Sequence, residues 1–296
     1  MRILLTGATG FIGTALVSAL ADHQLTVLSR DPVKAKQKLG GQHHYLGNLE
    51  QLESLADFDA IINLAGEPIG DGRWTPQRKQ AIETSRWQLT TRLTKLFFAA
   101  QQRPTTWINA SAIGVYGPRD SSPVDESGPT GNDFAASVCT RWEAIASKVA
   151  QHTRLCIVRI GLVMHPDGGA LAKMLPPFKM GGGGQIGSGS QMMSWIHRQD
   201  MIDLVIYLLG NKEADGLFNA TAPTPVSNKQ FVQALGHALH RPSVIPIPAA
   251  AMKLMFGEMS TLLLTGQAVL PRATQHVGFQ FSFPTIEQCF SDLFRK

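Results

Sequence analysis

Three glycines near the start of the chain, Gly7, Gly10 and Gly13, have the spacing of a turn that binds the phosphates of a nucleotide. A short apolar run, Arg2–Leu5, precedes them, and apolar residues at helical spacing follow them. A glycine turn between a strand and a helix lets the backbone approach a pyrophosphate, whose charge the first N–H groups of the helix bind. The spacing is G-x-x-G-x-x-G, whereas the standard fingerprint is G-x-G-x-x-G, and a tight turn without a ligand is the alternative. Because a strand and a helix flank the turn, we predict a dinucleotide site.

The second strand, Leu25–Leu28, is followed by Ser29 and Arg30, and Arg30 lies twenty positions after Gly10. A site for NAD usually has an acidic residue here, which binds the ribose 2′-hydroxyl. A guanidinium and a hydroxyl favour a 2′-phosphate instead. Asp31 comes one residue later and is interpreted as a helix cap. We therefore predict NADP as the cofactor.

Polar side chains follow two further strands at their carboxyl ends. Glu67 follows the apolar strand Ala60–Gly66, and Ser111 follows the strand Thr106–Ala110. In a parallel sheet these ends face the crevice in which ligands bind. A carboxyl group and a hydroxyl there can exchange a proton with a substrate, so Ser111 and Glu67 are the predicted catalytic pair. The alternatives are that Glu67 caps the loop or binds the cofactor ribose, and that Ser111 caps a turn.

A parallel sheet is the element that brings these residues to one edge. Further strands are predicted at 43–46, 155–160 and 217–220, and a long helix at 75–102. Strands that are nearly continuous in apolar residues and that alternate with helices predict an α/β fold, a Rossmann-type doubly wound parallel sheet.

The chain is expected to divide into two units. Residues 1–165 form the NADP-binding Rossmann domain, with its sheet completed by a strand near 216–220. Residues 166–296 form a smaller C-terminal substrate lobe with a helical end, in which the predicted helix 249–264 is rich in Met and Leu.

The composition of the 296 residues, with 44% hydrophobic and 17% charged residues, is that of a globular protein. The net charge of +5 is modest, and without a basic stripe we expect no nucleic-acid partner. Cys139, Cys156 and Cys289 are an odd number without C-x-x-C spacing, which predicts neither disulfides nor a metal site. No apolar run reaches the ~18 residues of a membrane span, and no signal peptide is expected. We therefore expect a cytoplasmic protein without a membrane partner.

Several motifs in combination resemble a known family. They are T-G-A-T-G-F-I-G, S-R after the second strand, N-L-A-G-E-P-I, S-A-I-G-V-Y-G and R-I-G-L-V. This set resembles the extended short-chain dehydrogenase/reductases, which include nucleotide-sugar epimerases. The G-R-W at 72–74, S-R-W at 85–87, S-W-I-H at 194–197 and the ending from Gly257 resemble the subgroup called the NADP-binding epimerase family, including its C-terminal domain. The resemblance covers essentially the whole chain.

The residues expected to contact NADP come from the glycine turn, the ends of the first four strands, the loop after the fourth strand and the segment after the sixth. They are Gly7, Thr9, Gly10, Phe11, Ile12, Gly13, Ser29, Arg30, Asn48, Leu49, Leu64, Ala65, Gly66, Glu67, Arg73 and Val163.

One departure from the family pattern affects the chemistry. The wider superfamily carries Tyr-x-x-x-Lys on the helix after the fifth strand, and the lysine lowers the tyrosine pKa for proton exchange. When Glu143 is aligned with the glutamate that often follows this lysine, Ala135 takes the place of the tyrosine and Cys139 that of the lysine. The candidates to replace the pair are Glu67, Arg73, Ser111, Tyr116 and Cys139, each with a structural alternative.

The leading prediction is an NADP-dependent oxidoreductase or epimerase that acts on a sugar-like or nucleotide-sugar substrate. The alternative is an NADP(H)-binding sensor or regulatory protein that has lost catalysis. The absent Tyr-x-x-x-Lys favours the alternative, whereas the substrate lobe and Ser111 favour the enzyme. Either a monomer or a homodimer is expected.

Overall fold

The protein is described over residues 1–295 by a computed structural model. Its centre is a seven-stranded sheet in the order β11-β7-β5-β4-β1-β2-β3, in which every neighbouring pair is parallel. The strands are β1 (Arg2–Thr6), β2 (Gln24–Leu28), β3 (His44–Leu46), β4 (Ala60–Asn63), β5 (Thr106–Ala112), β7 (Arg154–Ile160) and β11 (Gly216–Ala220). The strand order reverses between β1 and β4, as in a doubly wound Rossmann-type sheet. The predicted α/β fold class is confirmed.

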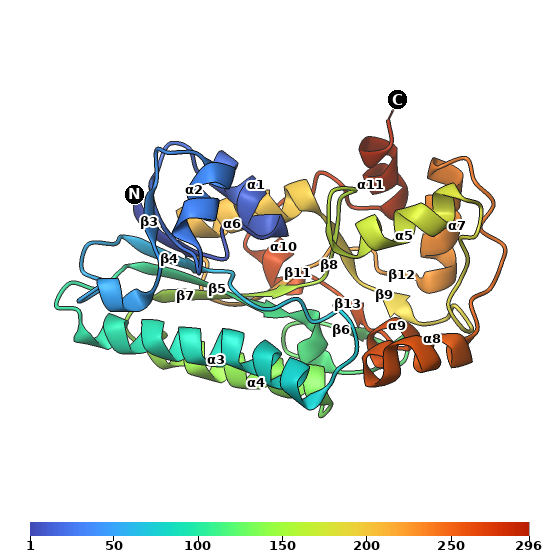
Figure 1. Ribbon diagram of the computed structural model, residues 1–296, viewed down its shortest axis with the longest axis horizontal. Helices are drawn as coiled ribbons and strands as arrows, with labels where there is room; N and C mark the ends of the chain where they lie inside the picture. The colour runs from blue at the N-terminus through green and yellow to red at the C-terminus, as the bar shows by residue number, and fades with distance from the viewer. Residues whose placement is uncertain (296) are drawn as a thin grey trace.

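Helices cover both faces of this sheet. In Figure 1, α3 and α4 lie below the sheet, and α1, α2 and α6 lie above it. The helices are α1 (Phe11–Ala19), α2 (Pro32–Leu39), α3 (Pro76–Ala99), α4 (Phe134–Ala146), α5 (Gly169–Lys179), α6 (Arg198–Gly210), α7 (Asn228–Ala238), α8 (Ala249–Phe256), α9 (Thr261–Leu264), α10 (Arg272–His276) and α11 (Ile286–Leu293).

A smaller group of elements lies at one end of the sheet, on the right in Figure 1. It contains α5, α7, α8, α9 and α11 and short two-stranded pairs. The short strands are β6 (Pro123–Val124), β8 (Leu162–Met164), β9 (Met192–Met193), β10 (Trp195–His197), β12 (Val226–Ser227) and β13 (Ala268–Val269). Its own apolar cluster includes Trp195, Phe231 and Phe290, which are all fully buried.

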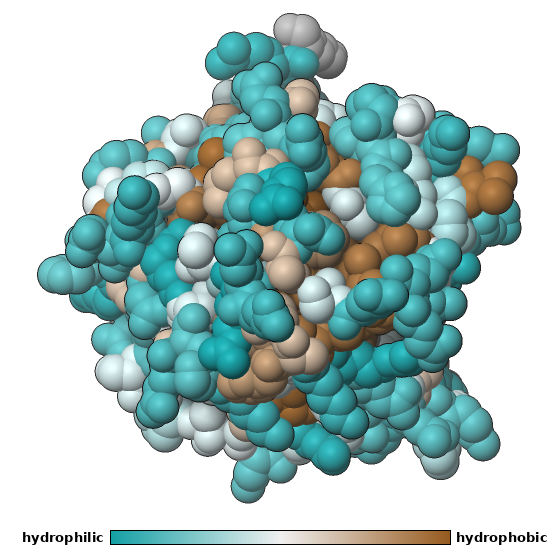
Figure 2. Space-filling view, turned by 90° about the vertical axis from the view of Figure 1, so that its left-hand side faces the viewer, coloured by the Kyte–Doolittle hydropathy of each residue, from teal (hydrophilic) through white to brown (hydrophobic). Residues whose placement is uncertain are grey.

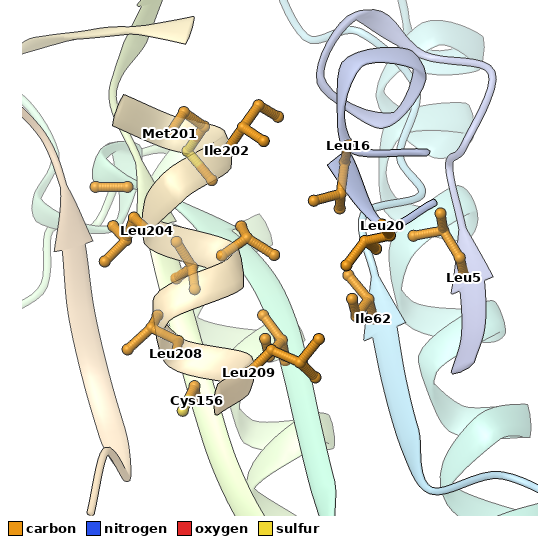
Figure 3. Close-up of a cluster of buried hydrophobic side chains, with 14 of the residues drawn as sticks. Leu5, Leu16, Leu20, Ile62, Cys156, Met201, Ile202, Leu204, Leu208 and Leu209 are labelled. Atoms are coloured by element: carbon orange, nitrogen blue, oxygen red, sulfur yellow. The ribbon is translucent and has the colours of Figure 1, made fainter. Parts of the chain in front are cut away.

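The core above the sheet is built by helices that pack on apolar strands. Leu16 of α1 and Leu20, which follows that helix, lie against Leu5 of β1 and Ile62 of β4, and α6 contributes Leu208 to the same cluster (Figure 3). Strands covered on both faces read as continuous apolar runs, as β4 does.

Three helices and strands end at other residues than the sequence analysis predicts. The fourth strand ends at Asn63, so Leu64–Gly66 leave the sheet before Pro68. The fifth strand continues through Ser111 to Ala112, which places Ser111 inside a strand. The predicted helix 249–264 is broken at Gly257, whose φ of 59° is left-handed and ends α8.

Polar side chains bind the elements together at the carboxyl end of the central strands. The Thr6 hydroxyl donates to the Asn63 side chain at 2.7 Å, and Asn63 Nδ2 donates to Asn109 and to Thr90 of α3. Trp142 of α4 donates to the same Thr90 hydroxyl. These groups are buried and satisfied, so they fix how β1, β4, β5, α3 and α4 meet beside the site.

The end of the molecule where the chain begins is mostly hydrophilic, with smaller hydrophobic patches (Figure 2). Among the helices of residues 1–295, none has the length and apolarity needed to cross a membrane.

Candidate functional site

The glycine turn closes tightly between β1 and α1. Gly7 has a left-handed φ of 74°, and a Cβ there would lie 2.7 Å from the Leu64 carbonyl carbon. A Cβ at Gly13 would lie 2.1 Å from the Gly7 carbonyl oxygen. Both positions therefore require glycine, because strand, turn and helix approach closely.

Gly10 differs from its neighbours because it faces open space. It precedes α1 in an extended conformation without a side-chain cap, and a Cβ there would meet only the Gly7 oxygen, at 3.2 Å, among residues 1–295. The N–H groups of Phe11 and Ile12, in the first turn of α1, have no intrahelical partner. The Lys38 ammonium donates to the Thr9 carbonyl at 2.9 Å and adds a positive charge. This open cradle of N–H groups fits the phosphates of a dinucleotide.

The carboxyl end of β2 carries a charged pair. Arg30 Nη1 donates to Glu67 Oε1 at 2.8 Å, and the Arg30 side chain is 92% exposed. Ser29 Oγ accepts from the Asp31 amide at 3.3 Å, and Asp31 accepts from the Lys34 amide at the start of α2. The interpretation of Asp31 as a helix cap is confirmed, and Arg30 remains the exposed charged side chain at this strand end.

Glu67 lies among arginines at the end of β4. Besides Arg30, its carboxylate contacts Arg78 of α3 at 3.4 Å, and the Arg78 guanidinium also donates to the Pro68 carbonyl. The Glu67 amide donates to Ser85 Oγ at 3.0 Å. The Ala65 amide donates to Thr6 Oγ1, which ties the segment after β4 to the end of β1 beside the glycine turn.

Other predicted contact residues lie around this edge. Val163 of β8 is buried in the cluster against which Phe11 packs, and a Cβ at Gly168 would lie 2.5 Å from the Phe11 ring. The segment after β7 is therefore held against the start of α1. Asn48 caps a short 3-10 helix by accepting from the Glu50 amide, and Leu49 is buried in a core cluster.

Ser111 takes part in a buried chain of polar groups rather than in a pair with Glu67. Ser111 Oγ donates to Glu143 Oε1 at 2.6 Å, and Arg159 binds both oxygens of Glu143, at 2.9 and 2.8 Å. Burial alone would lower the pKa of Arg159, but the hydrogen bonds and charge of Glu143 raise it above its ordinary value. The two contacts with Arg159 therefore orient Glu143 so that its Oε1 accepts from Ser111.

The positions aligned with the absent tyrosine and lysine lie inside the protein. Ala135 and Cys139 of α4 are both buried. Burial raises the pKa of the Cys139 thiol to about 11, so this thiol is neutral near pH 7. Tyr116 is also buried, and its hydroxyl donates to Asn219 at 2.8 Å and accepts from Arg159. Cys139 and Tyr116 are thus as buried as Ser111.

The loop after β4 joins the Rossmann sheet to the smaller group of elements. Arg73 donates to the carbonyls of Leu254 and Met255 at the end of α8, which occupies the guanidinium away from the glycine turn. Lys173 of α5 donates to the Gly70 carbonyl at 3.1 Å. The loop is therefore held from both sides over the carboxyl ends of the strands.

A separate hollow of about 560 Å³ lies at the opposite edge of the sheet, around Arg2, Gln24 and His44. These residues stand at the amino ends of their strands, whereas parallel sheets bind ligands at the carboxyl ends, so we do not assign the site there. Among residues 1–295, no group of three metal-ligating side chains is present.

At the carboxyl edge of the sheet, the sequence analysis did not identify four charged residues as part of the site: Lys38, Arg78, Arg86 and Glu143. Each lies on a helix and reaches the site through a contact between segments that are distant in the sequence. The contact between Ser111 and Glu143, for example, joins residues 32 positions apart. The S-R-W motif at 85–87 was the one signal that could have pointed to Arg86.

Comparisons with known proteins agree with this arrangement. Residues 3–220 match the model of the NAD dependent epimerase/dehydratase family, and residues 247–293 match a domain of unknown function, DUF1731. The predicted family resemblance and its C-terminal domain are confirmed.

The similarity to individual relatives extends over nearly the full chain. The chloroplastic epimerase family protein SDR39U1 homolog of Arabidopsis thaliana is 40% identical over 97% of this chain and 85% of the relative. The crystal structure of the human epimerase family protein SDR39U1 (isoform 2) with NADPH is 36% identical, covers 100% of both chains and has a TM-score of 0.92. The predicted cofactor, NADP, is thus the one present in that relative.

A more distant structure shares the fold. The UDP-glucuronic acid 4-epimerase from Bacillus cereus, in complex with UDP-glucuronic acid and NAD, is 18% identical with a TM-score of 0.77, over 100% of this chain and 99% of that chain. The family model covers most of this chain, and the closer relatives cover it nearly end to end. The chain belongs to the NAD dependent epimerase/dehydratase family.

Proposed function

We propose that this chain is an NADP(H)-dependent oxidoreductase or epimerase that acts on a sugar-like substrate linked to a nucleotide. The observation that carries the proposal is the open N–H cradle at Gly10 beside Arg30, at the carboxyl edge of a doubly wound sheet. The cradle suits the pyrophosphate, and an exposed guanidinium suits the 2′-phosphate that distinguishes NADP from NAD.

NADP(H) would supply hydride transfer, and the residues around the crevice would bind and orient it. The first-turn N–H groups of α1 and Lys38 would hold the phosphates, and Arg30 would hold the 2′-phosphate. Leu64–Gly66 lie next to the turn, where they would contact the bound cofactor. The human relative determined with NADPH supports this cofactor.

A nucleotide-sugar substrate is supported by the fold and by the smaller unit. The Bacillus cereus epimerase that shares the fold was determined with UDP-glucuronic acid. In this chain, the part of residues 166–296 that lies at the end of the sheet serves as the substrate lobe, and residues 1–165 with β11 and with α6, which packs on the sheet, serve as the cofactor domain. Arg73 and Lys173 join the two units across the loop that lies over the crevice.

Proton exchange is assigned to Ser111 and Glu67. A hydroxyl both donates and accepts hydrogen bonds, so Ser111 can pass a proton between a substrate oxygen and the Glu143 carboxylate to which it donates. Glu67 lies at the neighbouring strand end with 22% of its side chain exposed, so it is accessible to a ligand.

The test is turnover of a panel of nucleotide-sugar and carbonyl substrates with NADPH. Losing a general acid or base typically slows a reaction by roughly 10²–10⁴-fold. Ser111→Ala or Glu67→Gln should therefore slow turnover by this factor while NADPH affinity holds. Ser137→Ala, which changes an exposed serine of α4, is the matched control and should retain activity. Turnover that both site variants leave intact would remove these residues from the mechanism.

A non-catalytic NADP(H)-binding sensor is the second candidate. It is favoured by the buried Ala135 and Cys139 at the positions of the absent tyrosine and lysine. If NADPH binds and raises the melting temperature while the whole panel gives no turnover, the sensor replaces the enzyme.

The proposal includes a cytoplasmic location. The three cysteines are free and buried, which suits a reducing compartment. For the oligomeric state, the proposal is either a monomer or a homodimer.

A further inference from the structure

The Arg86 guanidinium lies directly against the backbone at the end of β4. A Cβ built on Gly66 would be 2.8 Å from Arg86 Cζ and 3.0 Å from Nη2. Arg86 comes from α3, whose buried Thr90 and Ile82 hold that helix against the sheet and α4. The absence of a side chain at Gly66 thus leaves room for a cation at the edge where ligands bind.

Among residues 1–295, the Arg86 guanidinium has no ion-pair contact with a carboxylate, although the more distant Glu67 carboxylate favours its charged form. Nη1 donates to the Ile82 carbonyl at 3.0 Å, and the guanidinium lies 5.2 Å from the centre of the Trp142 ring. Within residues 1–295, no carboxylate oxygen lies within 4.0 Å of this guanidinium, whereas Arg30 and Arg78 both contact Glu67. Burial lowers the pKa of Arg86 below its ordinary value.

A partly buried cation without a partner is costly, and an arginine has five N–H donors to satisfy. The contacts with Ile82 and Trp142 satisfy only some of the N–H donors of the Arg86 guanidinium and give it no ion pair. An anionic oxygen from a ligand would complete this site with a charge-assisted hydrogen bond.

The position of Arg86 is next to the reaction site. Its positive charge favours the ionised form of the Cys139 thiol, although burial dominates and raises the pKa of that thiol. Cys139 of α4 occupies the position at which the related reductases carry lysine, so α4 supplies no positive charge there. Arg86 of α3 supplies one instead.

We propose that Arg86 binds an anionic oxygen of the substrate beside Gly66, so that the substrate carries a carboxylate or phosphate group near its reacting centre. This inference rests on the proposed function, since it takes the cofactor to occupy the neighbouring cradle. A phosphate of NADPH is the other source of an anionic oxygen, and the experiment separates the two.

The experiment measures the melting temperature of the NADPH-loaded protein during titration with inorganic phosphate and, separately, with acetate, at constant ionic strength. Wild type should show a saturable increase. Arg86→Met should weaken the apparent affinity by at least about tenfold, and Arg86→Lys, which keeps the charge but not the planar fork, by less. Arg92→Met, which changes an exposed arginine of the same helix, should behave as wild type.

Each other outcome counts against the proposal. An equal response in wild type and Arg86→Met, or no saturable response in wild type, would overturn it. A response that appears only without NADPH would assign the anion to the cofactor instead. If Arg86→Met does not fold, Arg86→Lys decides, because an unchanged response would exclude binding by this guanidinium. Failure to bind NADPH at all would contradict the proposed function, which is a separate result.

Discussion

Arg30 Nη1 and Glu67 Oε1 are 2.8 Å apart, so a contact across 37 residues of sequence joins the ends of β2 and β4 over the end of β1. Glu67 is anchored on its other side by Arg78, whereas the Arg30 side chain is 92% exposed. Arg30 can therefore turn to a ligand phosphate while Glu67 keeps a second cation. We therefore propose Arg30 as the residue that would distinguish the 2′-phosphate of NADP from the free hydroxyl of NAD.

Arg30→Ala should lower the affinity for NADPH by roughly 10- to 100-fold, because it removes a charge-assisted hydrogen bond to the 2′-phosphate. The affinity for NADH, which lacks that phosphate, should stay nearly constant. Isothermal titration calorimetry measures both. Lys34→Ala, which changes an exposed cation of α2 that pairs with Asp31, is the control. An equal loss for both cofactors would show that Arg30 does not read the phosphate.

Gly10→Val should abolish NADPH binding in a folded protein, because a branched side chain would fill the cradle while meeting little of the chain itself. Gly13→Ala should instead destabilise the fold by roughly 1–3 kcal/mol or more, since its Cβ would lie 2.1 Å from the Gly7 oxygen. Thermal melts and calorimetry distinguish the two effects. If folded Gly10→Val binds NADPH as tightly as the wild-type protein does, the cofactor phosphates do not bind at this glycine turn.

Glu143→Gln should destabilise the protein by roughly 3–5 kcal/mol, because it leaves the buried Arg159 guanidinium without its counter-charge. The exposed pair Arg92–Glu50 offers the comparison, and Glu50→Gln should have a much smaller effect. Urea denaturation measures both changes. Similar losses for the two variants would mean that the buried pair contributes no more than a surface pair.

The free energy of unfolding should decrease as the pH is lowered, because His197 is protonated in the unfolded state before it is protonated in the folded protein. Burial lowers the pKa of this imidazole from 6.5 to about 4, despite the nearby Asp292 carboxylate. Between these two pH values the unfolded state binds the extra proton, so stability is complete above pH 6.5 and decreases by up to about 3 kcal/mol toward pH 4.

The His197 prediction is checked by urea denaturation at pH 7.5 and pH 5. His197→Asn keeps a side chain that can cap α6, where His197 now accepts from the Gln199 amide, and it should reduce the difference between the two pH values. An unchanged difference would assign the pH dependence to other groups.

Local sequence signals predicted the parts of the site that depend on neighbours in the chain. The glycines at 7, 10 and 13 and the Asp31 cap are of this kind, because turn and cap chemistry acts over a few residues. Partners brought together by the sheet were not visible. The sequence predicts Ser111 at a strand end, yet its strand continues to Ala112 and its partner, Glu143, is on the helix α4.

The most direct test of the account is a calorimetric comparison of NADPH and NADH binding to the wild-type protein. Arg30 and the open cradle at Gly10 predict that NADPH binds more tightly by roughly 1–3 kcal/mol. Equal affinities for the two cofactors, or tighter binding of NADH, would contradict the assignment of this edge as an NADP(H) site.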